Sequence, residues 1–330
     1  MKAKFQELQK SPAFRVFKSL WGLILLFAAF SILSPVFCTL NNILTVTLQM
    51  AIYALLALGI AYVLIVGGAE LSAGSIVGVT GMIFVLALQA EINVFIAGVL
   101  ALLVGMFCGF CNGFMVTKMK MIPFIATLGM QYIARGVTQL LSRGSSISLR
   151  TAVTDPGVYK ALTFIGSGKV FTYIPMATVL VLVFYLIHRI VLNRTSFGRK
   201  VYAVGSNREA ARLSGIDADK ITIGAYLVSA VMATFAGLLL VMRVTTAQST
   251  GGTGYEFEGI AASVIGGISM MGGEGNVTGC LIGAAMLAVM RNGLNLLGIN
   301  TFWQNIVTGV VIIAAVYLDI RRRTKEAENV

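Results

Sequence analysis

Residues 194–220 read RTSFGRKVYAVGSNREAARLSGIDADK, a polar stretch that lies between two apolar runs. This stretch holds six of the 25 lysine and arginine residues of the chain. The chain has 330 residues, of which 57% are hydrophobic and 12% are charged, about half the charge content of soluble domains. Apolar runs of about 20 residues are long enough to cross a bilayer. The sequence therefore predicts an all-α integral membrane protein.

Ten apolar runs are predicted to form transmembrane helices in a single domain. The eighth run is short and rich in glycine, so we expect it to be broken or only partly inserted. The predicted spans are residues 19–37, 43–66, 74–90, 93–116, 122–141, 172–192, 221–242, 258–271, 277–297 and 303–319. The connecting parts are a cytoplasmic N-terminus (1–18), an external loop (142–171), a cytoplasmic loop (193–220) and a cytoplasmic basic tail (320–330).

The distribution of basic residues predicts the orientation. With the N-terminus inside, 18 lysine and arginine residues fall on the inner side, five fall on the outer side, and two lie within spans. Cytoplasmic loops carry such an excess, so both termini are predicted to be cytoplasmic. The net charge of +12 is therefore explained by topology and contact with membrane lipid, and we expect no nucleic-acid partner.

Several chemistries find no support in the sequence. The chain has one histidine, His188, and no cluster of acids or nucleophiles at one depth, so we expect no catalytic residues. Gly166–Val170 lacks the first glycine and the hydroxyl residue of a phosphate-binding loop. Cys108–Cys111 has no second ligand pair, so no metal site is expected. An ion-coupled secondary carrier remains a less favoured alternative, because ionisable residues in or beside the spans are sparse.

The polar stretch contains a predicted short helix. Ser206 or Asn207 is a suitable N-cap, Glu209 falls in the first turn, and Gly215 stands where a helix stops. About two turns of helix are too short to be stable alone, so this helix needs a partner surface. The alternative is a surface loop with chance helix signals.

Five stretches of the sequence resemble bacterial ABC importer permeases of the ribose and simple-sugar group. These stretches are GSNREAARLSGI, IVGGAELSAGS, MIPFIATLGMQYIARGVTQLLSRG, AQSTGGTGYEFEGIAASVIGGISMMGGEGNVTG and RNGLNLLG. The resemblance covers nearly all of residues 40–320, in order. Two departures put the identity of the sugar in doubt. Arg291 stands where an uncharged residue is common, and Phe257-Glu258-Gly259 replaces the usual Leu-Asp-Ala.

The resemblance implies a type II importer-like bundle that transports a monosaccharide by alternating access. It implies a second permease subunit (the same chain or a paralogue), a cytoplasmic ATPase with two nucleotide-binding modules, and a periplasmic or lipid-anchored sugar-binding protein. ATP and magnesium would be bound by the ATPase, and this chain would carry no cofactor. A nucleoside or another small polar solute is the alternative cargo. The residues expected to couple to the ATPase are Gly205, Asn207, Glu209, Ala210, Ala211, Ser214 and Gly215.

Polar residues in the spans are the candidates for the solute pathway, although buried amides also bond neighbouring helices. These candidates are Gln49, Asn112, Gln131, Arg291, Asn292 and Asn295. For Arg291 three roles remain open: extension to the outer interface, an ion pair with Glu256 or Glu258, or lining of the path. The candidate outer gate comprises Gly254, Tyr255, Glu256 and Glu258.

Overall fold

The computed structural model describes residues 12–171 and 173–328, and these residues are mostly helical. Five of the described helices are long and apolar enough to cross a membrane. They are α3 (Leu40–Ile65), α5 (Val94–Thr117), α9 (Met176–Arg194), α12 (Ala218–Val244) and α14 (Val277–Leu296). The remaining helices at predicted spans are α2 (Pro12–Leu33), α4 (Ala73–Gln89), α6 (Pro123–Ser142), α13 (Tyr255–Ile265) and α15 (Thr301–Glu328). A helix therefore lies at each of the ten predicted positions, and the predicted all-α class is confirmed.

The eighth predicted span is a half-helix. α13 has 11 residues and a length of roughly 17 Å, about half the thickness of a bilayer core. Residues 245–254 precede it in a non-helical path, in which Gly252 and Gly254 adopt positive φ angles of 72° and 84°. These angles suit glycine and not residues with a Cβ. The observed helix therefore begins three residues before the predicted span 258–271 and ends six residues before the end of that span.

Close backbone contacts hold the helices together. Gly105, Gly109 and Gly113 of α5 face α12, where a Cβ on each would lie 2.0–2.8 Å from the nearest α12 atom. A Cβ on Gly279 of α14 would lie 1.7 Å from the carbonyl oxygen of Gly266, at the end of α13. Small residues at this spacing allow helix backbones to approach closely in lipid.

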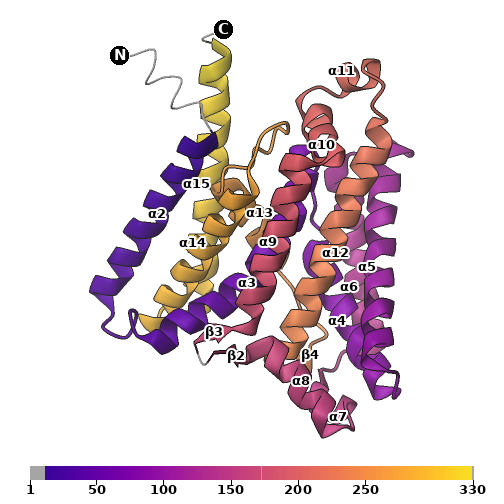
Figure 1. Ribbon diagram of the computed structural model, residues 1–330, viewed down its shortest axis with the longest axis vertical. Helices are drawn as coiled ribbons and strands as arrows, with labels where there is room; N and C mark the ends of the chain where they lie inside the picture. Colours follow the sequence, from indigo (N-terminus) through magenta and orange to yellow (C-terminus); the bar gives the residue numbers. More distant parts are fainter. Residues whose placement is uncertain (1–11, 172, 329–330) are drawn as a thin grey trace.

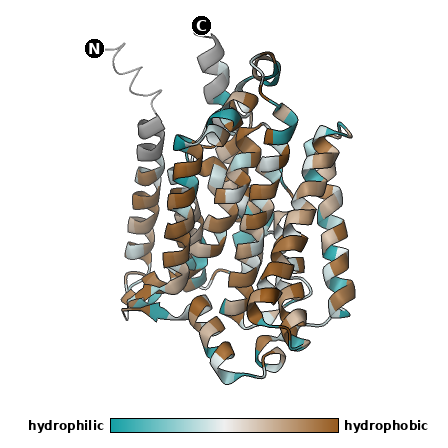
Figure 2. Ribbon diagram, turned by 45° about the vertical axis from the view of Figure 1, so that its right-hand side comes forward, coloured by the Kyte–Doolittle hydropathy of each residue, from teal (hydrophilic) through white to brown (hydrophobic). Residues whose placement is uncertain are grey.

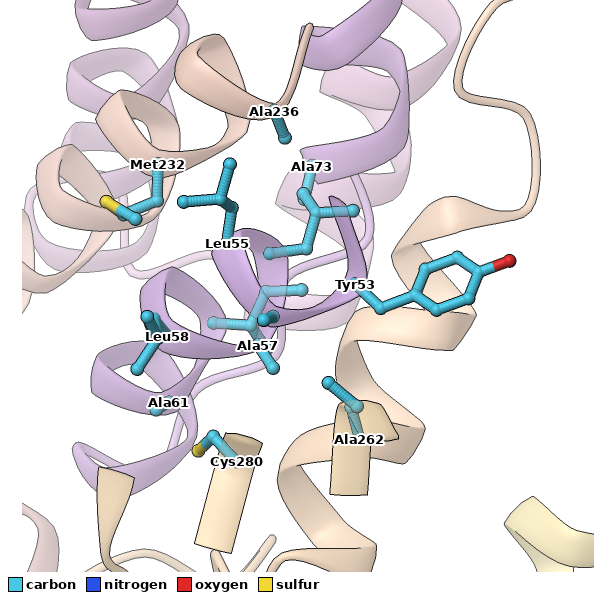
Figure 3. Packing of buried hydrophobic residues seen from close by; sticks show 14 of the residues in the cluster. Tyr53, Leu55, Ala57, Leu58, Ala61, Ala73, Met232, Ala236, Ala262 and Cys280 are labelled. Carbon is cyan, nitrogen blue, oxygen red and sulfur yellow. The ribbon is translucent and has the colours of Figure 1, made fainter. Parts of the chain in front are cut away.

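α3 lies at the centre of the bundle, and its residues 51–65 are all buried. Figure 3 shows its side chains packed between residues of α12, α13 and α14. α5 and α9, in contrast, expose most of their apolar residues, and Figure 2 shows the hydrophobic colour continuing along the outer helix faces. Such outer surfaces suit contact with lipid, where exposed apolar residues have no cost.

The two ends of the bundle differ. One end carries α10 (Ser196–Ser206) and α11 (Arg208–Leu213), together with the start of α2 and the end of α15 (Figure 1). The opposite end carries α7 (Leu149–Ala152), α8 (Pro156–Ser167) and two short antiparallel pairs. The strands are β1 (Ile147–Ser148) with β4 (Thr246–Ala247), and β2 (Lys169–Val170) with β3 (Ile174–Pro175). The predicted external loop 142–171 is therefore largely structured.

Cysteine labelling tests the predicted orientation. Ser167 and Ser206 are exposed at opposite ends of the bundle. In a chain whose four native cysteines are replaced, Ser167→Cys should react with an impermeant thiol reagent added outside intact cells. Ser206→Cys should react only in inverted membranes, because the 18 inner basic residues hold that end inside. Labelling of both positions from one side would contradict the prediction.

Candidate functional site

The predicted short helix is α11, at the end of the bundle opposite to α8. Asn207 is its N-cap, and the Asn207 Oδ1 atom accepts a hydrogen bond from the Ala210 amide at 2.9 Å. Gly215 follows the helix with a φ of 79°, in the left-handed region. The predicted helix is confirmed, because capping and stop signals act within a few residues of the chain.

The preceding helix, α10, was not predicted. Its N-cap is Thr195, whose hydroxyl accepts a hydrogen bond from the Gly198 amide at 3.2 Å. Val201 and Val204 are buried. With Phe197 they form a 4–3 apolar spacing that follows the capping residue, a pattern typical of an amphipathic helix. This pattern is present in the sequence, but basic residues interrupt it, so the segment does not form an apolar run.

The residues expected to couple to an ATPase occupy different environments. Ala210 is exposed, and 80% of the Glu209 side chain is exposed. Leu213, at the end of α11, is 89% exposed. Ala211 is instead 4% exposed and packs into the hydrophobic core. Ala211 therefore supports α11 from beneath and presents no surface to a partner.

Gly205 also differs from its expected role. A Cβ at this position would lie 1.7 Å from the carbonyl oxygen of Ile65 and 2.7 Å from the amide nitrogen of Gly273. The end of α10 thus touches the end of α3 and the loop after α13 through backbone atoms. The glycine is needed for this close approach, and it anchors α10 to the membrane helices.

Asp219, at the start of α12, connects α11 to the membrane helices. Its side chain is 14% exposed. The carboxylate contacts Arg208 at 2.8 Å and Arg212 at 3.2 Å, both from α11. It also contacts Lys118 at 3.2 Å and Lys120 at 3.8 Å, from the turn between α5 and α6. One carboxylate therefore joins α11 and the start of α12 to the turn between α5 and α6, which lies about 100 residues away in the sequence.

Asp219→Asn is expected to loosen α11. The amide cannot neutralise four neighbouring cations, so we expect a loss of about 1–2 kcal/mol of docking free energy. Hydrogen–deuterium exchange of residues 208–216 in the purified protein should accelerate by about fivefold or more. Asp217→Asn is the matched control. Asp217 caps α12 and pairs with Lys220, whose hydrogen bonds lower the pKa of Asp217. Asparagine caps a helix as well as aspartate does, so this substitution should leave the start of α12 intact. Equal exchange in the two variants would contradict the connecting role of Asp219.

Glu70 lies in the turn between α3 and α4, two residues before Ser72, the N-cap of α4. Its side chain is completely buried. Glu70 Oε1 accepts hydrogen bonds from the Ser72 amide and hydroxyl at 2.7 and 2.6 Å, and Oε2 accepts one from Asn112 at 3.3 Å. Asn112, a pathway candidate, is therefore engaged in joining α5 to the turn between α3 and α4.

The segment before α13 is held against α4 by two side chains of α6. Arg135 Nη1 donates to the carbonyl oxygen of Gly251 at 2.6 Å, and Gln131 Nε2 donates to Glu256 Oε1 at 2.8 Å. A Cβ on Gly252 would lie 2.2 Å from the carbonyl oxygen of Gly74. Gln131, another pathway candidate, thus supports the segment that was expected to contain the outer gate.

A polar cavity of about 280 Å³ lies where α3, α12, α13, α14 and the start of α15 meet. Three of the six pathway candidates line it: Gln49, Arg291 and Asn295. Asn292 does not, because its amide donates to Asn42 Oδ1 at 2.9 Å. Arg291 forms an ion pair with Glu258, the second of the three roles left open by the sequence, and it also borders the cavity.

Sequence reasoning missed other residues of this cavity, among them Tyr53, Arg243 and Gln304. Tyr53 follows Gln49 by four residues, and Asn295 follows Arg291 by four, so each pair lies on one helix face. This spacing is the signal that identifies Tyr53. Nothing in the sequence places Arg243 or Gln304 beside them, because each lies on another helix.

Comparison with known proteins gives the family. The family described as "Branched-chain amino acid transport system / permease component" matches residues 42–316. The chain belongs to this permease family. It is 38% identical to the "Ribose import permease protein RbsC" of Escherichia coli (strain K12), covering 93% of this chain and 94% of that protein.

Two further relatives have similar coverage. The permease is 33% identical to the "D-allose transport system permease protein AlsC" of Escherichia coli (strain K12), over 96% of this chain and 97% of that protein. It is also 33% identical to the "Autoinducer 2 import system permease protein LsrC" of Photorhabdus luminescens, over 94% of this chain and 91% of that protein. No solved structure matches the permease. The chain is therefore a multi-pass transport component of the bacterial inner membrane, and such permease components are not enzymes.

Proposed function

We propose that this permease is the membrane subunit of an ATP-driven importer for a monosaccharide. The observation that carries the proposal is the near full-length match to a protein named for ribose import. The D-allose relative supports the same class of cargo. The autoinducer 2 relative favours one alternative, a different small polar solute carried by the same mechanism.

The α10–α11 end supports the proposal that another polypeptide supplies the energy. An exposed, capped helix that presents Glu209, Ala210 and Leu213 offers a contact surface for a cytoplasmic ATPase with two nucleotide-binding modules. ATP and magnesium would be bound there. When the modules close, movement of α11 would pass through Asp219 to α12 and to the turn between α5 and α6. A second permease subunit and a periplasmic or lipid-anchored sugar-binding protein complete the proposed importer, which exchanges inward-open and outward-open states.

Reconstitution tests this proposal. The permease is placed in proteoliposomes with a candidate ATPase and a candidate sugar-binding protein from the same organism, and uptake of D-ribose, D-allose and adenosine is measured. We expect ATP-dependent uptake of a monosaccharide, and none with an ATPase unable to hydrolyse ATP. ATP-dependent uptake of adenosine alone would favour the nucleoside alternative, and sugar uptake without ATP would favour a secondary carrier.

A further inference from the structure

The polar cavity lies in the half of the bundle nearer α8, which is the predicted outer half. Its walls come from the middle of α3, the last residues of α12, the start of α13, the last turns of α14 and the start of α15. Its volume of about 280 Å³ is near the lower limit of about 300 Å³ that is typical of small-molecule sites. The cavity is therefore suited to one small solute and not to a peptide or a lipid chain.

Polar and aromatic groups converge on this cavity. Tyr53 and Tyr255 lie edge to face, with their ring centroids 5.9 Å apart. Figure 3 shows that the Tyr53 ring turns away from the packed apolar residues of α3. Gln304 donates to Asn295 Oδ1 at 2.6 Å and so holds that side chain in place. Sugar sites commonly combine such an arrangement of amides with aromatic rings that pack against C–H groups.

Three polar atoms in and behind the cavity wall are buried without a hydrogen-bond partner. They are Gln49 Oε1, Arg291 Nε and Glu258 Oε2. A buried polar atom without a partner costs roughly 1–3 kcal/mol, so each of these atoms calls for an explanation. Two of them belong to side chains that line one cavity, so rotation of these side chains would bring both atoms to a solute bound there.

The chemistry of these atoms defines the solute. Gln49 Oε1 and Glu258 Oε2 can only accept hydrogen bonds, whereas Arg291 Nε can only donate. A hydroxyl group does both, so a polyhydroxyl compound matches the set. The Glu258 carboxylate already offsets the charge of Arg291, so the pair does not favour an anion.

We propose that this cavity is the monosaccharide subsite of the permease, with Gln49 accepting from one sugar hydroxyl and Arg291 donating to another. This inference rests on the proposed function and names the side chains that contact the sugar. Glu258 is a positioning residue that holds the Arg291 guanidinium at the wall. Few hydrogen bonds suit a transport site, because the solute must leave as readily as it enters.

Two conservative variants and one control test the subsite in the reconstituted importer. Gln49→Met keeps the size of the side chain but removes the acceptor. Arg291→Lys keeps a cation for Glu258 but removes the Nε donor. The control is Ser229→Ala, because Ser229 Oγ is also buried without a partner but lies on α12 against Gly59, away from the cavity. Protein amount is measured for each variant, so that uptake is expressed per permease molecule.

We expect ATP-driven D-ribose uptake per permease to fall about fivefold or more in Gln49→Met and Arg291→Lys, and to remain unchanged in Ser229→Ala. A second readout is independent of turnover. In a chain without its native cysteines, D-ribose should slow thiol labelling of Gln49→Cys in the purified permease, whereas glycerol at the same concentration should not.

The outcomes separate the two proposals. Normal uptake in both variants, or equal labelling of Gln49→Cys with D-ribose and glycerol, overturns the subsite and leaves the importer function intact. If the wild-type importer takes up no sugar, the proposed function fails and the subsite fails with it. Slower uptake in all three variants would also overturn the subsite, because it would show a general effect of altering buried polar atoms.

Discussion

Ala210→Trp is expected to reduce ATP-driven uptake to about a tenth or less, while the permease reaches the membrane in normal amounts. Ala210 is exposed on α11, and its backbone amide still bonds the Asn207 cap in the variant, so the helix itself is preserved. The indole adds a large group at the centre of the proposed ATPase contact, where truncations and steric changes have the greatest effect on affinity. Uptake, membrane protein amount and co-purification of the ATPase are measured together.

Ala161→Trp is the matched control for this variant. Ala161 is an exposed alanine of α8, at the opposite end of the bundle, so a tryptophan there should not affect ATPase association. Ala211→Trp should behave differently from both, because Ala211 is buried and its replacement lowers the amount of protein. Normal ATPase binding and uptake in Ala210→Trp would remove α11 from the proposed interface.

Gly205→Ala is expected to lower the amount of folded permease severely. The added methyl group would lie 1.7 Å from the carbonyl oxygen of Ile65. This clash is with a backbone atom, so no side-chain rotation can relieve it. The same oxygen accepts the Gly273 amide at 2.8 Å, so three segments would have to move apart. Overpacking costs about 1–3 kcal/mol, and contact with backbone atoms places this variant at the upper end.

The matched control for Gly205→Ala is Gly98→Ala, another helical glycine, where an added Cβ meets no atom within 4 Å. Alanine favours helix over glycine, so this variant should be neutral or slightly stabilising. Membrane-inserted protein and Tm in detergent are compared for the two variants. A normal amount and Tm in Gly205→Ala would show that the contact between α3, α10 and the loop after α13 is not needed for folding.

The sequence by itself determined the features that depend on contiguous residues. Runs of apolar residues found ten helices, because each helix satisfies its own backbone hydrogen bonds in lipid. Asn207 and Gly215 gave the limits of α11, because caps and left-handed turns act over a few residues. The glycines of α5 and α14 that contact neighbouring helices are spaced four residues apart, a repeat along one helix face that can be read from the sequence.

Only the tertiary structure decided which distant residues meet. The four cations around Asp219 and the burial of Glu70 beside Asn112 have no local signal. The cavity at Gln49 and Arg291 likewise depends on how five helices pack. Periodicity shows which face of a helix is buried but not which helix covers it, and the choice of neighbour is made by contacts between segments far apart in the chain.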